Sequence, residues 1–174
     1  MKRSVLFPLL VLMGCVAVLP TAAEEPPKKP PVPKRVLSPD APNGWLTDLK
    51  AAEEMQMRSG EQPLVILFTC SDSDPLCIKL RDTMIDRGLF KNLIAPNSVK
   101  LYVDFPKKRK LLPQEQKANN QLKAKYKIAK FPTTVVISGK GKKKGKEVMR
   151  IVGCPADYVR RLQKVVPAPQ TTSN

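Results

Sequence analysis

A continuous apolar run from Leu64 to Phe68 constrains the fold of this chain more than any other feature. Five apolar residues follow Pro63 without a polar interruption, which is typical of a strand buried on both faces. Such strands lie inside a sheet that helices cover on both sides. The run therefore predicts an α/β protein.

Further elements follow from hydrophobic periodicity and from the positions of glycine and proline. Helical patterns fall at residues 47–59, from 74 onward, and at 114–127 and 156–166. Strand patterns fall at residues 64–68, 99–104, 134–137 and 148–152. A crossover helix makes the first two strands parallel, and a Gly/Lys turn joins the last two as a hairpin. We therefore expect a central mixed four-stranded sheet flanked by helices.

Two of these helices have predicted inward faces. In the helix of residues 114–127, Ala118, Leu122 and Tyr126 are expected to face the core. In the last helix, Tyr158, Leu162 and Val165 are expected to do so.

The predicted topology brings distant residues to one edge of the sheet. The ends of the first and last strands and the start of the third lie at the same edge. Cys70, Cys77, Pro132 and Cys154 are therefore expected to gather there. Reactive and ligand sites of α/β sheets favour this edge.

The chain contains no histidine, and its net charge is +16. Without histidine, Ser-His and Cys-His hydrolases and His-bearing zinc sites are excluded. Chemistry must then rest on thiols, carboxylates or amines, and no metal or cofactor is expected.

Basic residues concentrate in the second half of the chain. Between Lys107 and Lys146 there are 14 basic residues, opposed only by Glu115. We interpret them first as a solvated face, and second as a surface for anionic lipid or acidic polysaccharide. Nucleic acid is not expected as a partner, because no aromatic residues interleave with the lysine runs.

The N-terminus has the pattern of a secretory signal peptide over residues 1–23. A basic start and an apolar run over residues 4–19 precede a predicted cleavage after Ala23. The apolar run is shorter than the about 20 residues that span a bilayer. We therefore expect export to the periplasm or beyond the cell. A lipoprotein-like box ending at Cys15 is the alternative, and only lipidation there would anchor the protein to a membrane.

Composition divides the rest of the chain into a linker, a domain and a tail. Residues 24–42 hold seven prolines, which predicts an extended, polyproline-like linker. Residues 43–166 are expected to form one folded domain, and residues 167–174 a disordered polar tail.

Three segments resemble the thioredoxin-like family, and specifically a bacterial exported group of it. Residues 68–80 resemble the group's stretch Phe-Thr-Gly-Ser-Asp-Trp-Cys-x-x-Cys, and residues 101–106 also resemble that group. Phe131, Pro132 and Thr133 resemble its cis-proline signature. The resemblance spans about residues 45–166. It implies a thioredoxin-like fold, in which these three residues and Cys154 would border a bound substrate segment.

The redox motif departs from the family pattern. Asp74 stands at the position of the attacking cysteine, and Cys77 at that of the resolving cysteine. Cys70 replaces a glycine, and Leu67 stands where a buried acid is often found. Asp74 followed by Pro75 is also an ordinary helix N-cap pattern, and a carboxylate there would raise the pKa of the Cys77 thiol.

Three cysteines remain after the predicted cleavage: Cys70, Cys77 and Cys154. We expect Cys70 to be the more accessible thiol and Cys77 to be largely buried. An exported compartment permits a disulfide. Cys70–Cys77 is the favoured pairing, and Cys70–Cys154 and Cys77–Cys154 stay open.

Three functions follow as hypotheses. The first is thiol–disulfide exchange on exported protein or peptide substrates through Cys77, with Cys70 or Cys154 as second thiol and Asp74 as cap or functional acid. The second is a redox-inert binding or chaperone-like module that keeps the substrate-binding rim. A surface for polyanions is a third and weaker hypothesis.

Overall fold

The computed structural model describes residues 41–167. The predicted signal peptide, Cys15, nearly all of the proline-rich linker and nearly all of the tail lie outside the described residues. Within residues 41–167, none of the helices has the length and apolar composition needed to cross a membrane.

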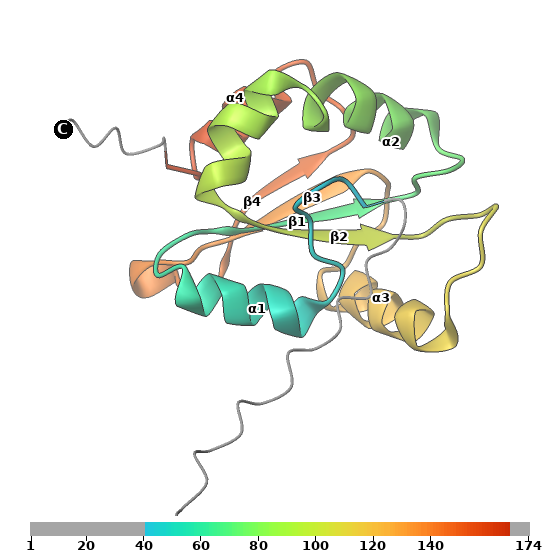
Figure 1. Cartoon of the computed structure of the whole chain (residues 1–174), viewed down its shortest axis with the longest axis horizontal. Helices are drawn as coiled ribbons and strands as arrows, with labels where there is room; N and C mark the ends of the chain where they lie inside the picture. Colours follow the sequence, from blue (N-terminus) through green and yellow to red (C-terminus); the bar gives the residue numbers. More distant parts are fainter. Residues whose placement is uncertain (1–40, 168–174) are drawn as a thin grey trace, which may run out of the picture. The chain divides into compact units, whose positions relative to one another are not determined.

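Within residues 41–167 the chain forms four α-helices and four strands, together with short π- and 3-10-helical turns (Figure 1). The helices are α1 (Leu49–Arg58), α2 (Pro75–Leu80), α3 (Pro113–Lys125) and α4 (Tyr158–Gln163). The strands are β1 (Leu64–Thr69), β2 (Val99–Asp104), β3 (Thr133–Ile137) and β4 (Glu147–Val152). Two π-helical turns, Arg81–Ile85 and Phe90–Ile94, lie between α2 and β2.

The strands form a single mixed sheet in the order β2–β1–β3–β4. β1 runs parallel to β2 and antiparallel to β3, and β3 runs antiparallel to β4. The predicted mixed four-stranded sheet is therefore confirmed. Phe68 pairs with both Val103 and Thr133, and Thr133 pairs with Val152, so the ends of three strands meet the start of β3 at one edge.

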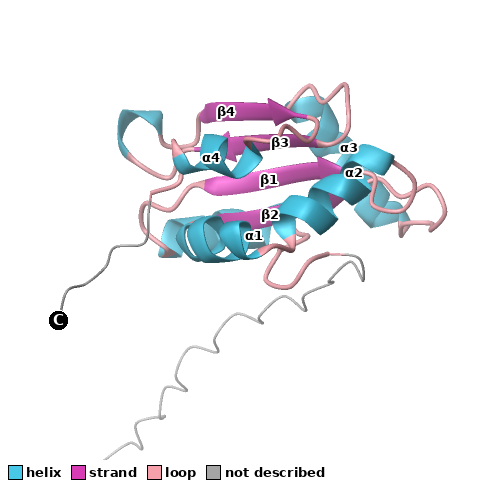
Figure 2. Cartoon of the chain, turned by 90° about the horizontal axis from the view of Figure 1, so that it is seen from above, coloured by secondary structure: helices cyan, strands magenta, loops and turns pink. Residues whose placement is uncertain are grey.

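The sheet separates two hydrophobic cores. All six residues of β1 are buried, as its apolar composition predicted. Val65 and Leu67 pack on the face of the sheet that α2 and α4 cover. Ile66 and Phe68 pack on the opposite face, which α1 and α3 cover (Figures 1 and 2). Alternation along the central strand thus supplies both cores.

Gly139 shows how closely the chain approaches itself after β3. A Cβ atom at this position would lie 2.1 Å from the backbone oxygen of Gln62. That separation is far inside van der Waals contact, so only glycine fits without a backbone shift.

The predicted faces of the last two helices need correction. In α3 the buried residues are Asn119 and Leu122, whereas Ala118 is exposed. The reason is a hydrogen bond from the Asn119 side-chain amide to the Asp104 backbone oxygen at 2.8 Å, which turns this polar residue inward. After α4, it is Val166 rather than Val165 that is fully buried.

Candidate functional site

The start of α2 is organised by Asp74. Its carboxylate accepts hydrogen bonds from the backbone N–H groups of Leu76 at 2.9 Å and Cys77 at 3.1 Å. Pro75 occupies the first helical position, where the missing donor costs nothing. The predicted helix N-cap is confirmed, and the carboxylate satisfies two N–H groups that are otherwise free at a helix start.

Cys77 lies in the first turn of α2 and is only 2 % exposed. Its Sγ accepts a hydrogen bond from the Cys70 backbone N–H at 3.3 Å. Burial raises the pKa of the Cys77 thiol to about 11, and the negative charge of Asp74 contributes in the same direction. The thiol is therefore protonated at neutral pH.

Cys70 follows the last residue of β1, and its side chain is 3 % exposed. The expectation that Cys70 is the accessible thiol is wrong. The Asp74 N–H donates to the Cys70 carbonyl oxygen at 3.3 Å, which closes a backbone turn directly after Cys70. The Cys70 Sγ lies 2.9 Å from the Ser73 Oγ.

Cys70, Cys77 and Cys154 are free thiols in this structure. The favoured Cys70–Cys77 disulfide is therefore not formed. The two residues do adjoin, but the Cys70 thiol contacts Ser73 while the Cys77 thiol contacts the Cys70 backbone.

Pro132 directly precedes β3, and the peptide bond between Phe131 and Pro132 is cis. The Pro132 carbonyl oxygen accepts a hydrogen bond from the Gly153 N–H at 2.8 Å. Cys154 comes directly after Gly153 and is half-buried. The Thr133 hydroxyl donates to the Lys130 carbonyl oxygen at 2.7 Å, which fixes the loop before β3.

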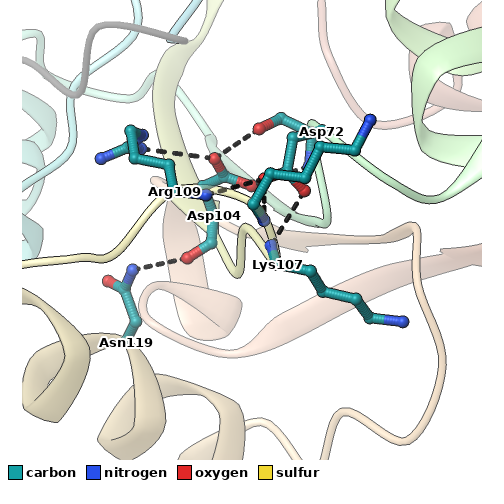
Figure 3. A network of polar contacts seen from close by, with 7 residues as sticks. Asp72, Asp104, Lys107, Arg109 and Asn119 are labelled. Carbon is teal, nitrogen blue, oxygen red and sulfur yellow. Dashed lines mark hydrogen bonds and ion pairs between the residues drawn. The ribbon is translucent and has the colours of Figure 1, made fainter.

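A network of carboxylates, which the sequence did not single out, fixes the loops at this edge (Figure 3). Asp104, at the end of β2, accepts hydrogen bonds from the Ser71 N–H at 2.9 Å and the Ser71 hydroxyl at 2.6 Å. It also forms an ion pair with Arg109 at 3.7 Å. The Ser71–Asp104 contacts tie the segment after β1 to the end of β2.

The Asp72 side chain binds backbone N–H groups of the loop after β2. Its carboxylate accepts hydrogen bonds from the N–H groups of Lys107 at 2.9 Å, Lys108 at 2.6 Å and Arg109 at 3.2 Å. These donors lower the pKa of Asp72 to about 2, and the Lys107 N–H has the largest effect. A sequence signal existed, because Asp104 is the last residue of a predicted strand and Asp72 follows four residues after another.

No group of three or more cysteine, aspartate or glutamate side chains capable of holding a metal ion occurs within residues 41–167. The residues at this edge instead offer thiols, a capping carboxylate and a proline loop.

The model of a thioredoxin-like domain family matches residues 49–162 of this chain. The chain belongs to this family. The family prediction made from the motifs at residues 68–80, 101–106 and 131–133 is thereby confirmed, and with it the thioredoxin-like fold.

Two curated relatives come from Chlamydia pneumoniae. The disulfide bond reductase DsbH is 32 % identical over 98 residues, which cover 56 % of this chain and 58 % of DsbH. The thioredoxin-related protein DsbJ is 27 % identical over 94 residues, which cover 54 % of this chain and 27 % of DsbJ. The matched segment therefore spans less than two thirds of either relative.

Solved structures give the same picture of the fold. A DsbH oxidoreductase superposes with a TM-score of 0.60 at 27 % identity, over 75 % of this chain and 90 % of its own. A thioredoxin from Thermus thermophilus superposes with a TM-score of 0.51 at 18 % identity, over 68 % of this chain and 84 % of its own, and supports the fold alone.

Proposed function

We propose that this chain is an exported thiol–disulfide exchange protein that acts on protein substrates through Cys77, with Cys70 as second thiol. The observation that carries the proposal is the contact between the Cys70 N–H and the Cys77 Sγ at 3.3 Å. It brings two thiol-bearing residues together where the family's redox motif lies. The similarity to proteins named disulfide bond reductase and thioredoxin-related supports the same reaction class. The signal-like residues 1–23 support export.

The reaction would proceed in two exchanges. The Cys77 thiolate attacks one sulfur of a substrate disulfide, which forms a mixed disulfide and releases a substrate thiolate that takes up a proton. The Cys70 thiol then loses its proton and attacks the Cys77 sulfur, which releases the second substrate thiol and leaves a Cys70–Cys77 disulfide. A dithiol reductant must return this bond to two thiols before the next cycle.

The environment of Cys77 makes the first exchange slow at neutral pH. A rise of the pKa from 9.0 to about 11 lowers the thiolate fraction about a hundredfold. Greater nucleophilicity of the more basic thiolate compensates for only part of this loss. Both thiols are also buried, so the structure around them must open locally before a substrate disulfide can reach them.

The surface beside the thiols supports a protein substrate. Leu76, at the start of α2, is 48 % exposed, and Val152, at the end of β4, is 53 % exposed. Phe131 and Pro132 directly precede β3, the strand that lies between β1 and β4 in the sheet. Exposed apolar side chains on a reactive edge are a contact surface for an extended polypeptide.

A redox-inert binding module is the second candidate, and Asp74 favours it. A carboxylate occupies the place of the family's attacking cysteine and accepts the very N–H groups that would stabilise a thiolate there. In this candidate the rim holds a polypeptide, and no exchange takes place.

Catalysed reduction of a protein disulfide separates the two candidates. Residues 24–174 should reduce insulin with dithiothreitol as the dithiol reductant, faster than dithiothreitol alone. We expect Cys77→Ser and Cys70→Ser each to abolish the acceleration and Cys154→Ser to retain it. Mass spectrometry of the protein trapped by acid should then find a Cys70–Cys77 disulfide.

Other outcomes would contradict the exchange proposal. A parent protein without activity that gains activity in Asp74→Cys would assign the chain to the redox-inert candidate. Activity that persists in Cys70→Ser but disappears in Cys154→Ser would contradict the assignment of Cys70 as the second thiol.

A further inference from the structure

One side of the rim carries a set of lysines that the exchange reaction does not use. We define the cationic flank by its members in the loop after β2, in α3 and before β3, which are Lys107, Lys108, Lys110, Lys123 and Lys130. All of these except Lys123 are exposed.

The first part of the cationic flank is held in place by the backbone. Asp72 binds the N–H groups of Lys107 and Lys108, and Asp72 is only two residues from Asp74 in the chain. Two residues span at most about 7 Å, so these lysines are fixed beside the start of α2. The Lys107 side chain extends away from the carboxylates, as Figure 3 shows.

The second part adjoins the proline loop. The rings of Phe105 and Phe131 stack with centroids 5.0 Å apart. The Lys123 ammonium lies 5.6 Å from the Phe105 centroid and 5.3 Å from that of Phe131. Phe131 precedes Pro132, and Phe105 lies two residues before Lys107. The stacked pair therefore joins the proline loop to the lysines of the loop after β2.

The carboxylates near the cationic flank are engaged by other groups. Asp72 is held by three N–H groups, Asp74 caps α2, and Asp104 binds Ser71 and pairs with Arg109. Within residues 41–167, no ion pair of 4.0 Å or less joins Lys107, Lys108, Lys110 or Lys130 to a carboxylate. The positive charge of these lysines is therefore directed to solvent along the rim.

We propose that the cationic flank selects acidic substrate segments, in which aspartate or glutamate lies close to the disulfide. The inference rests on the proposed function, because it assigns a substrate class to the same rim. Opposite charges along a binding edge raise the association rate and reject segments of the wrong sign. A nucleic acid fits less well, since the two phenylalanine rings stack on each other beneath Lys123 and offer no open platform for bases.

Peptide binding tests the inference without any exchange chemistry. Two peptides of equal length carry serine in place of cysteine. They differ only in that one has glutamate and the other glutamine at the same positions. Calorimetry at about 20 mM salt should give the glutamate peptide about tenfold tighter binding, which several weak surface contacts suffice to produce. At about 150 mM salt the preference should shrink, because charges at the surface are screened over about 8 Å.

Two matched triple variants locate the preference. Lys107→Gln, Lys108→Gln and Lys110→Gln together remove three charges from the cationic flank, while the N–H groups bound by Asp72 remain. Lys142→Gln, Lys143→Gln and Lys144→Gln remove three charges from the turn between β3 and β4, at the opposite end of β3 from Pro132. The first triple variant should lose the preference to within about twofold, and the second should keep it.

Three outcomes would overturn the inference. The first is equal binding of the two peptides at low salt, and the second is an equal loss of preference in both triple variants. The third is binding of the cationic flank to phosphatidylglycerol vesicles or heparin with no binding of the glutamate peptide. Because the peptides contain no sulfur, these results are independent of whether insulin reduction succeeds or fails.

Discussion

The Asp74 carboxylate and the Cys77 backbone N–H are joined by a hydrogen bond of 3.1 Å at the first turn of α2. The bond stabilises the helix start, and the same carboxylate opposes ionisation of the Cys77 thiol. Helix capping and thiol activation therefore compete for one place in this protein. With a cysteine at residue 74, the start of α2 would lose its capping carboxylate, and its N–H groups would stabilise a thiolate there instead.

Replacing Asp74 by asparagine should separate the cap from its charge. Asparagine caps helices about as well as aspartate, so the fold should be retained, while loss of the negative charge lowers the pKa of Cys77. We expect faster alkylation of Cys77 by iodoacetamide at pH 8, measured by mass spectrometry. Asp48→Asn is the matched control, because Asp48 caps α1 through the Ala51 N–H at 2.8 Å. An equal acceleration in this control would contradict the assigned role of the Asp74 charge.

Cys77 should also make stability fall at alkaline pH. Its pKa is about 11 in the folded protein, above the value of 9.0 for an exposed thiol. The folded state thus holds the proton more tightly, and this contribution is complete below about pH 9 and disappears as pH rises through 11. It amounts to about 3 kcal/mol. Urea unfolding from pH 8 to 11 should show a steeper loss in the parent than in Cys77→Ala, and parallel profiles would contradict the prediction.

Asp72 should govern the order of the loop after β2. Asp72→Ala removes the acceptor of three N–H groups, so the amides of Lys107, Lys108 and Arg109 should exchange with deuterium faster at neutral pH. Because the pKa of Asp72 is lowered to about 2, protection in the parent should persist below pH 4 and be lost as pH falls through 2. Unchanged exchange in Asp72→Ala would show that other contacts order the loop.

Gly139 should not tolerate even one added methyl group. A Cβ there meets the Gln62 backbone oxygen at 2.1 Å, so Gly139→Ala should destabilise the domain by about 1–3 kcal/mol through a forced backbone shift. At Gly88 the nearest atom to an added Cβ is a side-chain nitrogen of Asn92 at 3.8 Å, an ordinary contact. Thermal unfolding should separate the two alanine variants, and equal melting temperatures would contradict the prediction.

Much of the fold was predictable because its signals are local. The apolar run of β1 predicted a doubly buried strand, and Asp74 before Pro75 predicted the N-cap of α2. The connections then dictated a mixed sheet. The inward turn of Asn119 was not predictable, since its partner is the backbone oxygen of Asp104, 15 residues earlier in the chain.

The sequence alone determined the fold class, the family and the exceptional Asp74 at the redox motif, since each depends on residue types at short spacing. Only the tertiary structure decided the state of the thiols. Cys70 and Cys77 are both buried in the fold, where the Cys70 thiol contacts Ser73 and the Cys77 thiol accepts a hydrogen bond from the Cys70 backbone. The roles of Asp72 and Asp104 were likewise decided there, because their partners come from neighbouring loops that only the sheet brings within hydrogen-bonding distance.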